Sequence, residues 1–349
     1  MAPSSPQPRT PNPQTLPRWL KRNVPKGGAG HFTAKLIGQL GLQTVCEEAK
    51  CPNRMECYSR KTATFMILGD VCTRGCRFCG VKKGKPLPPE VDEPRRVAEA
   101  VSRLGLKHVV ITCVTRDDLP DGGAEHFART IAEIRGGAVA SGQWPVVSGQ
   151  SLGGCVSDSE GWPLQRPLGT PTIEVLPSDF AGNAAAVDRL IEAAPEVYNH
   201  NTETVPRLFP TVRGKKVSEL FFANSSTDVM LKHDLRGVFP SYRWTLEMFR
   251  RIHRAAPSIA LKTGMMLGLG ETTDELLDTW SDLLEAGCRM LTLGQYLQPS
   301  PAQMPVVRYV SPEEFERLGE MARRMGFEQV ASGPFVRSSY RAREMLNAE

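Results

Sequence analysis

The stretch "TATFMILGDVCTRGCRFCG" (residues 62–80) joins an apolar run to a loop that holds three cysteines. The run 62–68 is short and bounded by a glycine, which is typical of a buried strand. Cys72, Cys76 and Cys79 follow it in the spacing Cys-x3-Cys-x2-Cys. Thiolates are soft ligands that suit iron–sulfur clusters or zinc. A [4Fe–4S] cube has four irons, so three cysteines leave one iron open to a small chelating molecule. A zinc site that lacks one protein ligand is the alternative.

Apolar runs and helical patterns alternate along the rest of the chain. Seven runs are expected to form buried strands: 62–68, 107–112, 172–176, 196–200, 258–267, 289–294 and 327–332. Six segments favour helices: Glu93–Leu104, Gly123–Arg135, Ala184–Ala194, Tyr242–Ala256, Thr273–Glu285 and Pro312–Met325. This alternation predicts the α/β class and a parallel (β/α) barrel, whole or partial. Chemistry in such barrels sits at the carboxyl ends of the strands. The residues just past the strand ends are therefore expected to converge, namely Cys72, Asp117, Asn201 and Gly268.

Composition sets broad limits on the function. With 349 residues, 40% hydrophobic and 23% charged, the chain can bury the core of an ordinary globular enzyme. The formal net charge of +5 is compatible with an acidic partner protein but does not indicate a nucleic-acid binder. No apolar run reaches about 18 residues, so no membrane span is expected.

The cysteines are concentrated in one part of the chain. Six of the nine lie between residues 46 and 79, and Cys113, Cys155 and Cys288 are scattered. No secretory signal is recognisable, so a reducing compartment is expected, where clustered thiols indicate metal ligands rather than disulfides. The upstream stretch CEEAKCPNRMEC supplies a second triad, Cys46, Cys51 and Cys57. The two triads are interpreted as two separate clusters, with one site of six thiolates as the alternative.

The three-cysteine loop resembles the signature of the radical S-adenosylmethionine (SAM) superfamily, with Phe78 as the aromatic residue before the third cysteine. Both triads together resemble the lipoyl synthase family. The resemblance extends through TRDDLPDGGAEHF (115–127), IEVLPSDF (173–180), NHNTETVPRLFPTVR (199–213), KTGMMLGLGET (262–272), LTLGQYLQPS (291–300) and ASGPFVRSSYRA (331–342). It implies a partial parallel (β/α) barrel of the radical SAM type. It also implies N-terminal and C-terminal extensions that carry the second iron–sulfur cluster.

The resemblance also implies the ligands and cofactors. Cys72, Cys76 and Cys79 would hold the [4Fe–4S] cluster that binds SAM, whose reductive cleavage yields a 5′-deoxyadenosyl radical. The first triad would hold an auxiliary [4Fe–4S] cluster with a serine of Arg337-Ser338-Ser339-Tyr340 as fourth ligand. Ser339 is the preferred choice over Ser338, and a helix N-cap is the alternative role for this segment. A hard alkoxide matches iron poorly, so that corner is expected to be labile.

The implied activity is the insertion of two sulfur atoms at C6 and C8 of an octanoyl chain amide-linked to a lysine of a carrier domain. The carrier domains would be 2-oxoacid dehydrogenase E2 subunits or the glycine cleavage H protein. The auxiliary cluster would be the sulfur source. An electron donor such as ferredoxin or flavodoxin and an iron–sulfur carrier protein are the other expected partners, with no nucleic acid and no membrane. The alternatives are a biotin synthase-like enzyme, a methylthiotransferase, or an inactive metal-binding product.

Further residues are expected to contact SAM or the substrate. Thr115 and Asp117 lie in a loop beyond a strand, Asn201 and Glu203 lie at the mouth of another, and Lys262 is expected to face a carboxylate. Together with Phe78 these form the predicted cofactor-binding set. For each of the polar residues, a structural ion pair inside the barrel is the alternative.

The chain is expected to divide into four parts: a disordered leader (1–17), an N-terminal extension with the auxiliary cysteines (18–60), the partial barrel (61–326) and a C-terminal segment that closes the auxiliary cluster (327–349). The stretches 136–171 and 214–240 depart from the family pattern and are interpreted as insertions. A cytoplasmic location is expected. The acid-poor, basic N-terminus keeps a plastid or mitochondrial location as the alternative.

Overall fold

The computed structural model describes residues 16–21, 29–136, 171–214 and 241–346. Most of the predicted leader and nearly all of both predicted insertions lie outside these ranges, as does Cys155. Those expectations therefore stay predictions. In the described ranges, no helix is both long enough and apolar enough to cross a membrane.

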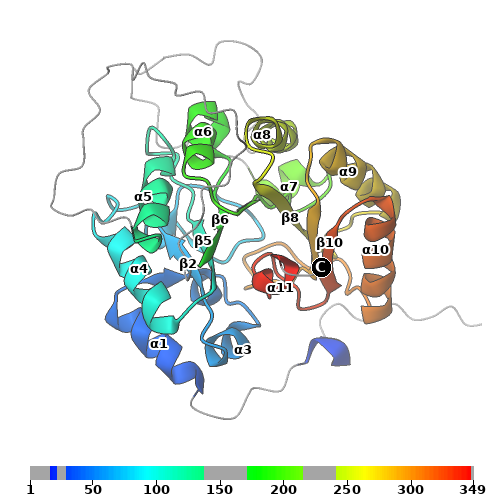
Figure 1. Cartoon of the computed structure of the whole chain (residues 1–349). Coiled ribbons are helices and arrows are strands. Elements are labelled where there is room, and N and C mark those ends of the chain that lie inside the picture. Colours follow the sequence, from blue (N-terminus) through cyan, green and yellow to red (C-terminus); the bar gives the residue numbers. More distant parts are fainter. Residues whose placement is uncertain (1–15, 22–28, 137–170, 215–240, 347–349) are drawn as a thin grey trace, which may run out of the picture.

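One eight-stranded sheet forms the centre of the molecule, in the order β1-β2-β5-β6-β7-β8-β9-β10 (Figure 1). The strands from β2 to β10 pair in parallel, and β1 (Gln43–Thr44) pairs antiparallel with β2. The seven parallel strands are β2 (Thr64–Ile67), β5 (His108–Cys113), β6 (Thr172–Leu176), β7 (Val197–Asn199), β8 (Ala260–Leu267), β9 (Met290–Gln295) and β10 (Gln329–Gly333). Each of these strands overlaps one of the seven predicted runs. The sheet does not close on itself, because β1 and β10 are its two edges. The predicted partial barrel is therefore confirmed.

The helices between the strands cover the outside of the sheet (Figure 1). They are α4 (Glu93–Leu104), α5 (Ala124–Ile134), α6 (Ala184–Glu192), α8 (Tyr242–Ala255), α9 (Thr273–Glu285) and α10 (Pro312–Met325). All six were predicted, to within two residues at either end. Capping interactions explain the best-defined helix ends. The Ser311 hydroxyl accepts a hydrogen bond from the Glu314 amide at the start of α10, and Gly326 ends that helix in the left-handed conformation.

Short elements in the N-terminal part, in the middle and at the C-terminal end of the chain complete the described structure. They are the 3-10 helices η1 (Arg18–Leu20) and η2 (Phe180–Gly182), α1 (Ala29–Gln39), α2 (Val45–Glu48), α3 (Arg54–Ser59), the paired strands β3 (Val71–Cys72) and β4 (Lys82–Lys83), α7 (Phe209–Arg213) and α11 (Ala342–Leu346). Helix α11 contacts both β5 and β10. Its Met345 packs in a buried cluster with Val197 and Met290. The C-terminal helix therefore lies against the inner side of the open barrel.

Candidate active site

A cavity of about 1160 Å³ lies between the sheet, the N-terminal helices and the C-terminal segment. All six clustered cysteines line it, although they come from two different stretches of chain. They are Cys46, Cys51, Cys57, Cys72, Cys76 and Cys79. The fold therefore brings both triads to one space. Of the four strand-end residues predicted to converge, Cys72 and Asn201 line this cavity, and Asp117 and Gly268 do not.

The turn from β2 into the Cys72 loop is held at a strained residue. Leu68 has a φ of 70°, which is unusual for a residue with a side chain. Its amide donates to Glu93 Oε2 at 2.9 Å, and its carbonyl accepts from Arg116 Nη1 at 3.0 Å. His126 Nε2 lies 2.6 Å from the same carboxylate oxygen. Buried polar side chains thus fix the direction in which the chain enters the loop.

The loop is anchored to two neighbouring strand ends through Arg74. This side chain is 4% exposed, and its guanidinium reaches Asp117 at 2.7 Å and Asp179 at 2.6 Å. Burial by itself would raise the pKa of Asp179, but the charge of Arg74 outweighs it and holds that pKa well below its usual range. Thr73 Oγ1 also donates to the Thr115 carbonyl at 3.0 Å. The three-cysteine loop therefore has a fixed position over the carboxyl ends of β5 and β6.

The thiols fall into two sets. Burial raises the pKa of Cys46 to about 12, and the nearby thiols that add to this effect are Cys51 and Cys57. Burial likewise raises the pKa of Cys79 to about 12, with Cys76 and Cys72 as the contributing thiols. Within each triad, neighbouring thiols thus add to the effect of burial on the pKa. This grouping supports two separate sites over one site of six thiolates.

The donor set fits iron–sulfur clusters. In a [4Fe–4S] cube each cysteine binds a different iron, so the ligands stand further apart than those of a single ion. Within the described ranges, no group of three or more His, Cys, Asp or Glu side chains is placed to hold a single metal ion. Because burial raises the pKa of thiols in both triads, binding of an iron–sulfur cluster would release protons.

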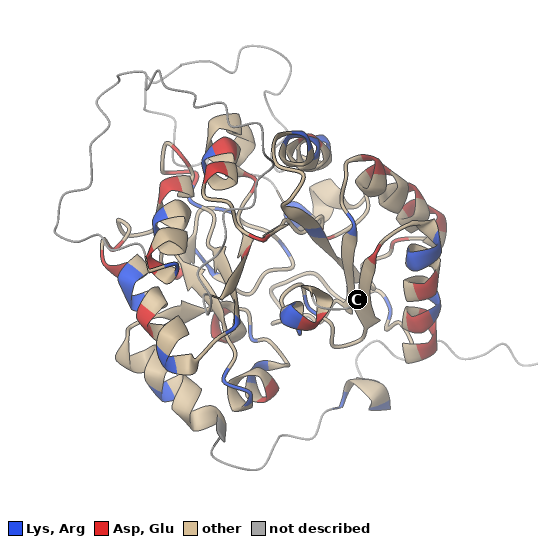
Figure 2. Ribbon diagram, viewed as in Figure 1, with Lys and Arg blue, Asp and Glu red and all other residues tan. Residues whose placement is uncertain are grey.

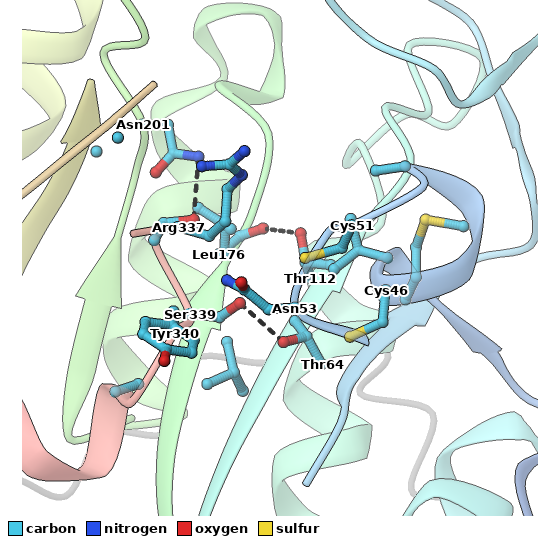
Figure 3. A pocket seen from close by; sticks show the side chains of 18 of the residues that line it. Cys46, Cys51, Asn53, Thr64, Thr112, Leu176, Asn201, Arg337, Ser339 and Tyr340 are labelled. Atoms are coloured by element: carbon cyan, nitrogen blue, oxygen red, sulfur yellow. Dashed lines mark hydrogen bonds between the residues drawn. The ribbon is translucent and has the colours of Figure 1, made fainter. Parts of the chain in front are cut away.

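The C-terminal segment reaches the first triad through three contacts, and Figure 3 draws the one between Thr64 and Ser339. Thr64 Oγ1 donates to Ser339 Oγ at 2.8 Å, Asn53 Nδ2 donates to the Phe335 carbonyl at 2.7 Å, and the Tyr340 hydroxyl donates to Glu56 Oε1 at 2.9 Å. These partners lie within or beside the stretch that carries Cys46, Cys51 and Cys57. Ser339 consequently lies on the same side of the cavity as the first triad.

Ser338 faces the other way. Its hydroxyl accepts a hydrogen bond from Asn201 Nδ2 at 3.4 Å, on the strand-end side of the cavity. The segment crosses β9 at Gly294, where a Cβ atom would lie 2.1 Å from the Val336 carbonyl oxygen. Only glycine allows this approach. The orientation of the two hydroxyls supports the choice of Ser339 over Ser338 as the cluster ligand.

Comparison with known proteins agrees with this geometry. The family model of the Radical SAM superfamily matches residues 66–283. The lipoyl synthase of Rhodopirellula baltica is 50% identical over 335 residues, which cover 96% of this chain and 89% of that protein. The chain belongs to the lipoyl synthase family. The lipoyl synthase of Desulfotalea psychrophila is 45% identical over 330 residues, covering 95% of this chain and 92% of that protein.

A weaker likeness links the chain to a solved structure. SuiB of Streptococcus suis bound to S-adenosylmethionine aligns with a TM-score of 0.48 and 8% identity, covering 80% of this chain and 54% of that chain. A likeness at this level does not bear on function. The relatives named lipoyl synthase, in contrast, do not support the biotin synthase-like and methylthiotransferase alternatives.

Four residues of the predicted cofactor-binding set line the cavity of this lipoyl synthase family member: Phe78, Thr115, Asn201 and Glu203. Asn201 Oδ1 is buried and has no hydrogen-bond partner in the part of the chain that the structure describes. Burial raises the pKa of Glu203, whose carboxylate lies 3.9 Å from Arg213. A buried acceptor and a carboxylate that face the second triad fit a polar ligand such as SAM.

Two residues of that set occupy other positions. Lys262 is fully buried and binds the Glu174 carboxylate at 2.9 Å, and it does not line the cavity. Asp117 is bound by Arg74 and likewise does not line the cavity. In both cases the structure has the ion pair that the sequence left open as the alternative. The geometry therefore favours a structural ion pair for these two side chains, and their contact with SAM stays a prediction.

Sequence reasoning missed three polar residues at the site: Arg74, Arg213 and Thr64. All three line the cavity. Arg74 lies inside the three-cysteine loop, and Arg213 ends the quoted stretch 199–213, so both were visible next to motifs. Thr64 is the first residue of β2 and looks like an ordinary strand threonine. Only its hydrogen bond to Ser339 makes its role visible.

Proposed function

We propose that this chain inserts two sulfur atoms, at C6 and C8, into an octanoyl chain carried on a lysine of a lipoyl carrier domain. Membership of the lipoyl synthase family supports this reaction. The observation that carries the proposal is that both cysteine triads and Ser339 line one cavity. A substrate held there is within reach of both triads.

The chain's residues divide into two groups around this cavity. Cys72, Cys76 and Cys79 would hold the SAM-binding cluster, with one iron left free of a protein ligand. Phe78, Thr115, Asn201 and Glu203 line the same cavity and would contact SAM. When loaded, this centre supplies the carbon-centred radical that an unactivated C–H bond requires. The Arg74 ion pairs keep its loop in place while the substrate enters.

Cys46, Cys51, Cys57 and Ser339 hold the auxiliary cluster. Three soft thiolates and one hard oxygen make an uneven donor set, in which the serine corner is the weakest. Thr64 donates a hydrogen bond to the Ser339 oxygen and so favours its presence near the triad. A weakly held iron at the serine position suits a cluster that gives up sulfur.

The remaining partners follow from the same proposal. Octanoylated E2 subunits and the glycine cleavage H protein are the carrier substrates. A ferredoxin or flavodoxin supplies electrons, and an iron–sulfur carrier protein rebuilds the auxiliary cluster after turnover. A cytoplasmic location, no nucleic acid and no membrane complete the proposal.

Anaerobic turnover tests the function. The reconstituted protein, SAM, a reductant and an octanoyl-lysyl peptide should give a product with two added sulfurs by mass spectrometry. Cys51→Ala should abolish sulfur insertion but still produce 5′-deoxyadenosine, because the SAM-binding triad is intact. Cys288→Ala is the matched control, since this thiol is buried outside the cavity. Deoxyadenosine without any thiolated product from the wild-type chain contradicts the proposal and favours the inactive alternative.

A further inference from the structure

One end of the cavity is lined by exposed cationic side chains. They are Arg60, Lys61, Lys107, Arg341 and Arg343, and together they are called the basic mouth. Arg60 and Lys61 lie a few residues before β2, and Lys107 directly precedes β5. Arg341 and Arg343 lie at the start of α11. Because α11 contacts β5, these segments surround one opening. Figure 2 shows Lys and Arg on α11 and on segments next to it.

Few carboxylates neutralise the cations at this opening. Among the described residues that line this end of the cavity, the carboxylates are those of Glu56 and Glu344. Glu56 lies 3.3 Å from Arg60, and Glu344 lies 3.5 Å from Arg341. In the described ranges, Lys107 and Arg343 have no carboxylate partner. Five cations against two carboxylates leave a positive potential that extends into the solvent.

The basic mouth leads directly to the first triad. Arg60 follows Cys57 by three residues, and Arg341 follows Ser339 by two. Apolar side chains of the inner sheet line the same cavity, namely Ala63, Met66 and Val110. An aliphatic chain that enters here passes over these side chains while the molecule that carries it stays outside.

We propose that the basic mouth is the docking surface for an acidic carrier domain, whose octanoyl-lysine then enters the cavity. This proposal rests on the proposed function and adds the entrance and the charge of the partner surface. Attraction between a basic rim and an acidic partner raises the association rate and is screened by salt. Because the rim lies outside the reacting centre, it acts on carrier domains and not on short peptides.

Charge reversal tests the docking surface. The probe is an octanoylated lipoyl carrier domain with a net negative charge, and its Kd is measured anaerobically at low salt. Lys107→Glu/Arg343→Glu should weaken binding by roughly tenfold, and Lys107→Gln/Arg343→Gln by a smaller factor. The matched control is Arg243→Glu, an exposed arginine in the first turn of α8. The control should bind like the wild type, and added salt should reduce wild-type affinity towards that of the reversed variant.

A second readout separates the docking surface from the function. All variants should thiolate an uncharged octanoyl-lysyl peptide at the wild-type rate. Equal Kd values for the wild type and the reversed variant overturn the docking proposal, as does an equal loss in the Arg243 control. Absence of thiolated peptide from the wild type, together with a retained difference in Kd, overturns the proposed function and leaves the docking surface supported.

Discussion

Ser338 and Ser339 are adjacent in the chain but point to different halves of the cavity. Ser338 Oγ accepts from Asn201, whereas Ser339 Oγ accepts from Thr64 (Figure 3). Helix capping was the alternative role for this segment, and Ala342–Leu346 indeed forms α11 two residues later. The hydroxyl of Ser339 nevertheless bonds to a strand residue of the barrel. The hydrogen bond from Thr64 therefore orients Ser339 towards the side of the cavity that holds Cys46, Cys51 and Cys57.

Thr64→Val removes this donor while it keeps the side-chain shape. Loss of a group that orients a ligand typically lowers metal affinity by about 10–100-fold, and we expect a loss in this range for the auxiliary cluster. The measurement is chelator-dependent iron loss in a chain that carries Cys72→Ala, Cys76→Ala and Cys79→Ala, so that the auxiliary site alone binds iron. Thr211→Val, at an exposed position in α7, is the control. Iron loss from Thr64→Val at the control rate argues against a role for this contact.

Helix α1 illustrates why the N-terminal elements escaped prediction. Its sequence AGHFTAKLIGQ contains two glycines and a threonine, which lower helix propensity. Tertiary contacts compensate, because Leu36 and Ile37 are buried in the main core and Thr33 Oγ1 donates to the Tyr58 carbonyl at 2.8 Å. The helix thus depends on α3, with which it packs. The element that carries Cys57 is stabilised in return.

Helix α11 plays the corresponding part at the other end of the chain. Met345 is 7% exposed and packs against Val197 and Met290 inside the barrel. Met345→Ala should lower the free energy of unfolding of the cluster-free chain by about 2–3 kcal/mol, measured by urea denaturation, because it leaves a cavity. Met55→Ala is a matched control at a methionine that is 40% exposed, with an expected change below about 1 kcal/mol. Equal effects of the two substitutions would show that α11 does not anchor the C-terminal segment.

At the scale of the whole molecule, the sequence predicts the regular barrel but not the polar contacts inside it. Apolar runs and helix-end signals identify β2, β5 to β10 and the six outer helices, because these elements bury one face against a common core. An ion pair was left open for Lys262, but its partner Glu174 was not predicted. The two residues lie on β8 and β6, which are separated by β7 in the sheet, so only the curvature of the barrel brings them together.

The part of the site that could be predicted is the part that the spacing of residues along the chain encodes. Both cysteine triads and the strand-end residues Asn201 and Glu203 were found from the sequence, and they do line one cavity. The contacts that orient them come from distant segments: Arg74 with Asp179, and Thr64 with Ser339. Such pairs depend on the register of neighbouring strands and on the path of the C-terminal segment, which no local pattern encodes.

Iron and acid-labile sulfide analysis of the anaerobically reconstituted chain tests the central claim most directly. Two cubes predict about eight irons and eight sulfides per chain, falling to about four of each in Cys51→Ala and in Cys76→Ala. Each of these variants removes a ligand from a different triad, so both should lose one cube and keep the other. About four irons in the wild-type chain, or a complete loss of iron in either variant, would contradict two independent clusters in one cavity.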